Sequence, residues 1–573
     1  MAPALRKRIP EGPATYETTA RGMAVLTSPS LNKGTAFTME EREALGLIGL
    51  LPPVVSTLES QVGSAYAQYQ RLPDAISKNF YLTALHDRNE VLFFRLFSEH
   101  LGEMIPIVND RTVGMAMEQY PHECRRPRGV YLSIDHADQI EEAFANFRAG
   151  PNDIDLILAT DAERIFGIGD WGVGGIEVAI GKLAIYTAAG GIDPARVIPV
   201  MLDVGTNRES LLANPMYAGN RHGRVRGERY DTFIESYMKT ATRLFPRAIL
   251  QWEDFGPGKG HRILQKYRDN IRTFNDDFEG TGAVALAAAV SAMRICGTLL
   301  EKQKIVIFGA GIGGIGVADL FRDVMVYAGL TLDQATRRFW CVDVNGLLTS
   351  DMGDKLEDFQ ASYARPAAEV RSWRGDPGSA SDGIGLAAVV RQVRPTMLIG
   401  MSGSAGAFTE PIVRNMARHT DRPIIFPLSS PASCAEANPA DLIVWTDGRA
   451  LISTGTQCLP VTHKGITHVI GQAKNPMLYP GLGLGTIVSG ARLISVGMLA
   501  AAANALSSLV AVRMPGASLL PHIDDLRRVT ATVAGAVAEA AATEGLATIA
   551  LIDIVSQVED AMWQPEYRNI QAV

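Results

Sequence analysis

The sequence predicts an α/β protein in which a helical N-terminal region precedes two regions built around parallel sheets. Three observations lead to this fold class. From Met39 to about Gln119, apolar residues recur at three- and four-residue spacing, which is typical of helices. From about Ile154, short β-like runs alternate with helical segments, as in βαβ units. The third observation is a glycine-rich turn between a β-branched run and a helix-like segment, at residues 304–316.

The remaining elements follow in chain order. Residues 1 to about 30 are punctuated by Pro, Gly and Thr, and we expect a loose arm there. After Gly282 an Ala-rich helix is expected, and the last hundred residues have a mostly helical pattern. We expect strands at Ile154–Ala159, Val197–Val204, Ala248–Glu253, Thr396–Gly400 and Pro423–Pro427.

The glycine-rich turn predicts dinucleotide binding. Gly309, Gly311 and Gly314 have G-x-G-x-x-G spacing, which suits a tight turn, a close approach to pyrophosphate and helix–strand packing. A second strand-like run, 338–343, ends in Asp343 at the position of a ribose-binding acid. The strand-like run before the glycines, and the helix-like segment and second strand-like run after them, favour a Rossmann-type domain over a purely structural turn.

Composition narrows the class of protein. The chain has 573 residues, of which 47% are hydrophobic and 20% charged, as in ordinary globular proteins. Its net charge of −7 argues against nucleic acid as a partner. The five cysteines include no C-x-x-C pair, and the basic residues 6–8 precede no apolar stretch. We therefore expect a cytoplasmic protein without disulfides, a secretory signal or a membrane partner.

Two neighbouring acidic segments are candidate metal ligands. Glu253 and Asp254 follow one predicted strand, and Asp276 and Asp277 lie a short way downstream. Carboxylates that converge in one cleft repel one another unless a hard cation such as Mg²⁺ or Mn²⁺ lies between them. Helix caps or solvated acids are the alternative.

Two basic residues are candidates for catalysis and substrate binding. Lys182 lies in an apolar, Gly-containing stretch, where desolvation would lower its pKa and suit it as a general base. Arg164 could bind a carboxylate through its planar guanidinium. The alternatives are that Lys182 is a surface lysine and that Arg164 forms a local ion pair with Glu163.

Short motifs in a fixed order carry a family resemblance. They are Leu31–Phe37, Gly49–Pro52, Arg88–Glu90, Arg125–Gly129, Thr160–Asp161, Gly167–Asp170, Gly181–Leu183, Asp203–Asn207, Glu253–Phe255, Phe274–Asp277 and Gly309–Gly311. On these motifs the chain resembles malic enzymes, and in places their bacterial malolactic relatives, from about Leu31 to Tyr567.

The resemblance implies an NAD-dependent decarboxylating dehydrogenase that acts on malate or a related 2-hydroxy acid. It implies five parts: an arm (1–30), a helical domain (31–130), a substrate and metal domain (131–281), a NAD-binding domain (282–466) and a C-terminal segment (467–573). A homodimer or homotetramer is expected.

The resemblance also implies roles for single residues. Glu253, Asp254 and Asp277 would hold Mg²⁺ or Mn²⁺, and Lys182, assisted by Asp276, would take the hydroxyl proton. Arg164 and Asn475 would bind the substrate carboxylate. Asp343 would accept a hydrogen bond from the adenosine ribose. Because the uncharged Val344 follows it, where the 2′-phosphate of NADP would need a cation, NAD is favoured over NADP.

Several positions depart from the family pattern. Asn109 stands where malic enzymes have a tyrosine that protonates the enol product, Ser430 replaces an Asn that contacts substrate, and Lys474 replaces another Asn. Arg111, Arg208 and Lys259 add further positive charge in or beside family motifs. Three hypotheses remain open.

The first hypothesis is an enzyme that still takes malate. The second is the same chemistry on a bulkier or more anionic malate analogue, with Lys474 binding the extra group or replacing the lost proton donor. The third is a non-catalytic NAD-binding homologue. A malolactic-type reaction is a further alternative, although malolactic relatives usually keep the tyrosine.

Overall fold

The computed structural model describes residues 6–8, 15–109, 112–114, 126–165, 167, 169–374 and 383–573. The chain divides into two compact units. The first comprises residues 1–149, 161–240 and 562–573, and the second comprises 150–160 and 241–561. Each unit is therefore built from segments that are distant in sequence. The five-part division expected from the family resemblance remains a prediction.

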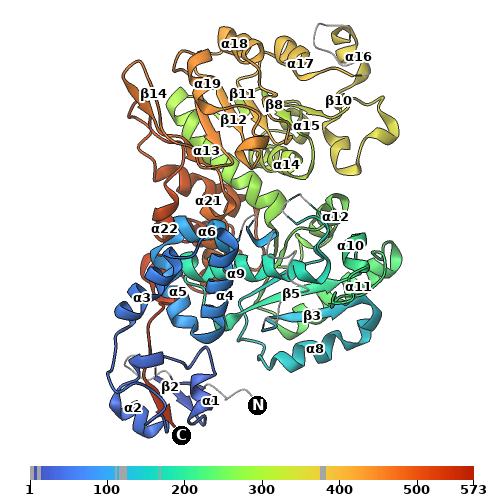
Figure 1. Ribbon diagram of the computed structural model, residues 1–573. Coiled ribbons are helices and arrows are strands. Elements are labelled where there is room, and N and C mark those ends of the chain that lie inside the picture. The colour runs from blue at the N-terminus through green and yellow to red at the C-terminus, as the bar shows by residue number, and fades with distance from the viewer. Residues whose placement is uncertain are drawn as a thin grey trace. The chain divides into compact units, whose positions relative to one another are not determined.

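The first unit contains the helical N-terminal region that the apolar spacing predicts. Its helices are α1 (Met23–Leu26), α2 (Met39–Ala44), α3 (Leu58–Gln70), α4 (Ala75–Arg88), α5 (Glu90–Glu99) and α6 (Leu101–Val108) (Figure 1). Side chains cap several helix starts. At α2 the Thr38 side chain accepts a hydrogen bond from the backbone N–H of Glu41, and at α5 the Asn89 side chain accepts one from the backbone N–H of Leu92. The first unit also holds α8 (Ile140–Phe147), α9 (Ile176–Gly190), α10 (Glu209–Leu212) and most of α11 (Glu228–Leu244).

Two sets of strands belong to the first unit. Strand β3 (Val130–Ser133) pairs in parallel with β5 (Val197–Asp203). A small sheet joins β1 (Arg6–Arg8) and β2 (Thr15–Thr18) to β17 (Ile570–Ala572) near the C-terminus. The expectation of a loose arm over residues 1–30 is thus wrong for residues 15–18, because β17, more than 550 residues away in the sequence, pairs with them.

The second unit contains a three-strand parallel array and a seven-stranded sheet. Strands β4 (Leu156–Thr160), β6 (Ile249–Trp252) and β7 (Thr273–Asn275) pair in that order, all in parallel. The larger sheet has the order β10-β9-β8-β11-β12-β13-β16. Its strands are β8 (Ile305–Phe308), β9 (Phe339–Asp343), β10 (Gly346–Leu347), β11 (Met397–Gly400), β12 (Ile424–Pro427), β13 (Leu451–Thr454) and β16 (Gly471–Gln472).

The five strands predicted from the sequence are confirmed to within two residues at each end. Helices α14 (Ile312–Tyr327), α17 (Leu386–Val393), α18 (Glu410–His419) and α19 (Pro439–Trp445) accompany the seven-stranded sheet (Figure 1). The parallel crossovers explain the near-continuous apolar strands, since both faces of the sheet are covered. A Val- and Ile-rich core between the sheet and α17–α19 results.

Ala-rich helices form a second layer of the second unit. Helix α13 (Thr281–Cys296) packs against α14 and α21 (Val496–Ser508), and α22 (Leu526–Thr543) packs against α20 (Tyr479–Ser489) and α21. The remaining helices include α12 (Pro257–Tyr267), α15 (Leu332–Thr336), α16 (Ala367–Val370) and α23 (Ile554–Ala561). Close packing depends on small residues, because a Cβ on Gly485 would lie 2.5 Å from the Ala534 carbonyl oxygen.

Two helical stretches are long and apolar enough to span a membrane, Gly172–Gly190 and Asp276–Cys296. Their most apolar windows are 89% and 78% buried inside the protein. The burial accounts for their apolar character, because they are core helices of their units.

Candidate active site and dinucleotide turn

Three carboxylates converge where two neighbouring strands end. Strands β6 and β7 pair in parallel, with Trp252 opposite Asn275, so the residues that follow both strands reach the same edge. Glu253, Asp254 and Asp277 each offer an oxygen there, and these oxygens lie within 4.8 Å of one another. The Asp254 amide donates to an Asp277 carboxylate oxygen at 2.9 Å.

The carboxylate cluster is a hard-oxygen donor set. Glu253 and Asp254 are 4% and 5% exposed, so water screens their mutual repulsion poorly. Asp254 has a left-handed backbone with φ of 57°, a conformation that Asp tolerates better than most residues. Buried carboxylates at this spacing fit an ion such as Mg²⁺ or Mn²⁺.

Asp276 lies beside the cluster in a single π-helical turn, Asp276–Gly280. Turns of this kind occur frequently at functional sites. Gly280 makes room for the carboxylate, because a Cβ there would lie 1.8 Å from an Asp276 oxygen. The Asn475 amide nitrogen donates to that side chain at 2.9 Å and to the Thr281 hydroxyl at 3.2 Å. The structure therefore joins Asn475 to Asp276, two residues that the sequence analysis treated separately.

The loop that carries Asn475 contributes two further polar groups. Lys474 is the N-cap residue of the 3-10 turn Asn475–Met477, and it is partly buried. Tyr479 follows at the start of α20 and is fully buried. Burial raises its pKa well above the ordinary value, and the charges of Asp276 and Glu253 add to the effect. The sequence gives no functional signal for Tyr479, because an aromatic residue in an apolar segment normally indicates core packing.

Ser430 follows strand β12 and is exposed. Its neighbour Ser429 donates its hydroxyl to the buried Glu436 carboxylate at 2.6 Å, and Ser402 donates both its amide and its hydroxyl to the same oxygen at 2.8 Å. Glu436 thus connects the loops after β11 and β12 and holds the turn that presents Ser430. No local sequence signal identifies Glu436, since its partners lie 7 and 34 residues away.

In the first unit, Lys182 and Asn109 occur on neighbouring helices. Lys182 lies on α9 and is 6% exposed, as expected from its apolar surroundings. Asn109 caps the C-terminus of α6, where its backbone N–H donates to the Ile105 carbonyl. A Cβ on Gly181 would lie 2.3 Å from the Val108 carbonyl oxygen and 3.3 Å from the Asn109 Cβ. The end of α6 therefore packs directly on the turn of α9 that carries Lys182.

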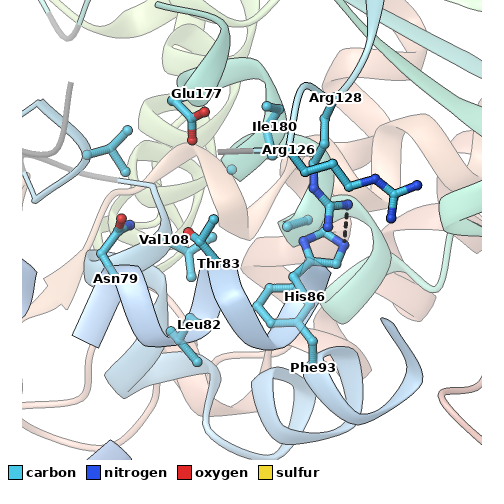
Figure 2. Close-up of a pocket in the computed structure, with 13 residues that line it drawn as sticks. Asn79, Leu82, Thr83, His86, Phe93, Val108, Arg126, Arg128, Glu177 and Ile180 are labelled. Carbon is cyan, nitrogen blue, oxygen red and sulfur yellow. Dashed lines mark hydrogen bonds between the residues drawn. The ribbon is translucent and has the colours of Figure 1, made fainter. Parts of the chain in front are cut away.

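A small cavity opens beside this contact, within the first unit (Figure 2). Its volume of about 40 Å³ is enough for a few water molecules. Arg128 contacts the His86 ring at 3.0 Å, and burial, together with the charges of Arg128 and Arg126, lowers the pKa of His86 well below its ordinary value. The polar lining residues are Asn79, Thr83, His86, Arg126, Arg128 and Glu177.

Arg164 is an exposed residue at the start of a short loop that the Ile165–Gly169 bridge closes. Arg224 is buried and donates to Asp170 at 2.6 and 2.9 Å and to the Asp161 carbonyl at 2.7 Å, on either side of Arg164 in the sequence. Burial opposes ionisation of Asp170, but its bonds to Arg224 hold the pKa of that carboxyl below its ordinary value. This buried network supports the segment that carries Arg164.

Three of the departures from the family pattern that add positive charge are Arg208, Lys259 and Arg111, and the surroundings of the first two differ. The Arg208 guanidinium lies 4.0 Å from the centre of the Trp171 ring, and its Nε donates to the Ser210 hydroxyl. Lys259 is partly buried on α12. Arg111 lies outside the described residues.

The glycine-rich turn joins β8 to α14 as the spacing predicts. Gly309 has a φ of 97°, and a Cβ there would lie 2.4 Å from the Met401 carbonyl carbon. A Cβ on Gly314 would lie 2.0 Å from the Gly309 carbonyl oxygen, so α14 packs closely on the turn. Gly311, the N-cap of α14, faces open space, which leaves its backbone accessible to a phosphate.

Asp343 ends β9, the strand next to β8. The Gln360 amide donates to an Asp343 carboxylate oxygen at 2.8 Å and to the Ala310 carbonyl at 2.7 Å. Gln360 thereby connects Asp343 to the glycine-rich turn, and no local sequence signal identifies it. Val344 follows with 89% of its surface exposed.

Comparisons with known proteins agree with this architecture. The family model described as "Malic enzyme, N-terminal domain" matches residues 86–268, and "Malic enzyme, NAD binding domain" matches residues 278–542. Among solved structures, a malic enzyme from Entamoeba histolytica is similar in fold, with a TM-score of 0.53 and 20% identity over 91% of this chain and 90% of that one.

Curated relatives are similar over almost their whole length. "NAD-dependent malic enzyme 3" of Bacillus subtilis is 56% identical, with 97% of this chain and 98% of the relative covered. "Putative malate oxidoreductase [NAD]" of Mycobacterium tuberculosis is 49% identical, over 95% and 98%. "Malolactic enzyme" of Lactiplantibacillus plantarum is 44% identical, over 95% and 98%. The chain therefore belongs to the malic enzyme family, as the ordered motifs of its sequence indicate.

Proposed function

We propose that this protein catalyses the divalent-metal-assisted oxidative decarboxylation of malate, with NAD as the hydride acceptor. The observation that carries the proposal is the convergence of Glu253, Asp254 and Asp277 at the ends of two adjacent strands, in a chain with a dinucleotide-binding turn. Relatives named as NAD-dependent malic enzymes and malate oxidoreductases support the substrate and the cofactor.

We assign metal binding to Glu253, Asp254 and Asp277. Their carboxylate oxygens, on the buried Glu253 and Asp254 and the partly buried Asp277, match the ligand preference of Mg²⁺ and Mn²⁺ and leave other coordination positions to substrate and water. A bound divalent cation supplies Lewis-acid stabilisation for the negative charge that develops on the substrate oxygen during loss of CO₂.

Lys182 is assigned the role of general base that takes the proton from the 2-hydroxyl group. Lys182 is 6% exposed on the largely apolar helix α9, so its amine is shielded from bulk water. Arg164 is exposed, between two residues that bond to Arg224, and is assigned to a substrate carboxylate. These roles rest on the positions that match the family motifs.

Asp276 and Asn475 act together in this proposal. The Asn475 amide donates to the Asp276 carboxylate, so the asparagine holds this acid in one orientation. Asp276 is assigned to assist the base, and Asn475 to bind the substrate carboxylate while it orients Asp276. Ser430 lies on the turn that Glu436 holds in place, and we assign it to substrate binding.

NAD is favoured over NADP by the surroundings of Asp343. One carboxylate oxygen of Asp343 accepts a hydrogen bond from Gln360. A carboxylate at this position can accept hydrogen bonds from a ribose diol. A 2′-phosphate would meet the negative charge of Asp343 and the uncharged, exposed Val344 instead of a cation.

A second candidate is the same chemistry on a bulkier or more anionic 2-hydroxy acid. Asn109 at the end of α6 favours it, because asparagine leaves more space than tyrosine and cannot donate a proton in the same way. Arg126 and Arg128 beside the adjoining cavity add positive charge. Lys474 would then bind the additional group or replace the lost donor.

The test is NADH formation by the purified protein with Mn²⁺, NAD and L-malate, compared with Lys182→Ala and the charge-conserving Lys182→Arg. We expect turnover by the unmodified protein and loss of at least about 10²-fold in both variants, since arginine cannot act as a base at neutral pH. Full activity of Lys182→Arg would contradict the assigned role.

Product analysis separates the alternatives. CO₂ release from malate without net NADH would identify a malolactic-type reaction. NAD binding with no turnover of malate, but with turnover of a 3-substituted or tricarboxylic 2-hydroxy acid, would favour the second candidate. NAD binding with no turnover of any such acid would leave a non-catalytic homologue.

A further inference from the structure

A second cavity lies in the second unit, apart from the carboxylate cluster and the glycine turn. Its volume is about 260 Å³. Strand β15 (Ile466–His468), strand β13 and the segment 512–519 contribute lining residues. The Val469 amide donates to the Gly516 carbonyl at 2.8 Å, which fastens two of these walls together. We name this space the arginine cavity.

The titratable side chains that line the arginine cavity are all basic. They are Arg422, Arg449, His468 and Arg513. Among the residues that the structure describes, none of those in the lining is acidic, although the whole chain has a net charge of −7. A concentration of positive charge in an acidic protein favours an anionic ligand.

The four basic groups are not equally available. Arg449 is structural, because its guanidinium donates to the carbonyls of Ala417, Asp421 and Thr446. Arg422 donates only its Nε, to the Arg449 carbonyl at 3.0 Å, and among the described residues no carboxylate pairs with it. Arg513 is exposed and likewise has no carboxylate partner in the described part of the chain. Two guanidinium groups thus retain donors for a ligand.

His468 adds a neutral donor or acceptor. Burial lowers its pKa, and the charges of His463 and Arg422 lower it further. The other walls are apolar, with Ile295, Ile443 and Leu519 among them. At the rim, Ile466, Val469 and Met514 are 40%, 45% and 66% exposed. A ligand here would meet both charged donors and aliphatic surface.

We propose that the arginine cavity binds a small amphipathic anion, a carboxylate or phosphate group on a short apolar body, with Arg422 and Arg513 holding the charged end. The volume lies just below the range of ordinary small-molecule pockets, which limits the ligand to a few carbon atoms beyond its head group. No role in the proposed decarboxylation uses these residues.

A short stretch of chain links the cavity to the loop that carries Asn475. Ile470 lines it and directly precedes β16, and Lys474 and Asn475 follow two and three residues after the end of β16. A ligand that shifts Val469 and Ile470 would act on the loop whose Asn475 bonds to Asp276. We therefore infer that the bound anion acts as an effector, an inference that rests on the proposed function.

Isothermal titration of the full-length protein tests binding without any turnover. The probes are hexanoate and hexyl phosphate, with acetate and inorganic phosphate lacking the apolar body and hexanol lacking the charge. We expect saturable binding of hexanoate or hexyl phosphate with one site per chain. The truncated and uncharged probes should bind at least about tenfold more weakly. The tighter of the two hexyl probes identifies the head group.

Three variants locate the site. Arg422→Gln and Arg513→Gln should each weaken binding about tenfold, and Ala517→Leu should block the apolar end. Arg418→Gln, an exposed arginine on α18 outside the lining, is the matched control and should bind as the unmodified protein does. Arg513 is exposed, so its substitution leaves the fold intact even if Arg422→Gln unfolds.

Several results would overturn the binding proposal: no saturable binding of either hexyl probe, equal loss in Arg418→Gln, or hexanol binding as tightly as hexanoate. If the cavity variants instead changed the oligomeric mass without any probe binding, this face would be an interface between copies of the chain, and the proposal would fail.

The effector inference has its own readout. Hexanoate or hexyl phosphate should change the KM for malate at least about twofold in the unmodified protein and not in Arg513→Gln. An equal change in both proteins would indicate competition at the active site and overturn the inference. Inactivity towards malate would refute the proposed function and leave the titration result standing.

Discussion

Replacement of Asn109 by tyrosine tests whether this position controls the proton that completes the reaction. The Asn109 Cβ lies 3.3 Å from the place of a Cβ on Gly181, one residue before Lys182. Tyrosine has its Cβ at the same place as asparagine, and because Gly181 has no side chain, the helix contact survives the change. Asn109→Tyr would therefore place a phenol beside the turn that carries Lys182.

The expected gain follows from the size of a general-acid effect. A positioned acid contributes about 10²- to 10⁴-fold, equivalent to about 3–5 kcal/mol of activation free energy. We expect Asn109→Tyr to raise kcat for malate by about 10²-fold or more if protonation limits the reaction. Asn109→Phe has the same ring without the hydroxyl, so it should give no gain.

The assay is steady-state pyruvate and NADH formation from L-malate with Mn²⁺ and NAD, for the unmodified protein and both variants. Equal rates for Asn109→Tyr and Asn109→Phe would refute the reasoning, because the hydroxyl would then contribute nothing. A gain below tenfold with tyrosine would show that another group already supplies the proton. Lys474→Asn, alone and combined with Asn109→Tyr, would then identify whether Lys474 is that group.

Three further predictions concern metal binding, pH and packing. Asp277→Asn should raise the Kd for Mn²⁺ about tenfold or more, measured by paramagnetic resonance, because one charged ligand is lost; unchanged affinity would remove Asp277 from the site. Burial raises the pKa of Glu90 from 4.5 to about 7, so its contribution to stability is complete below pH 4.5 and is lost as pH rises through 7. In urea unfolding, the free energy of unfolding of Glu90→Gln should therefore increase relative to that of the unmodified protein as pH rises from 4.5 to 7. A constant difference between the two proteins would contradict the raised pKa of Glu90. Gly181→Ala should destabilise the protein by about 1–3 kcal/mol, since its Cβ would lie 2.3 Å from a carbonyl oxygen. The matched helical variant Gly63→Ala, which meets no atom within 4 Å, should stabilise it by about 0.5–1 kcal/mol.

The local pattern of the sequence was enough to predict most of the secondary structure near the site. Short, mainly apolar runs identify β6, β8 and β11, because the residues of a buried strand are consecutive in the sequence. The convergence of Glu253 and Asp277 could also be expected, since residues that follow adjacent parallel strands reach one edge. The glycine spacing identified the turn before α14 for the same local reason.

Contacts between distant residues could not be read from the pattern. The bond from Asn475 to Asp276 spans 199 residues, and the pairing of β2 with β17 joins opposite ends of the chain. Gln360 and Glu436 gave no signal, because each acts through partners that only the packed sheet brings near. The sequence by itself determined the elements, the turn and the family. The tertiary structure decided which side chains meet, because those contacts depend on how the elements pack rather than on the residues beside them.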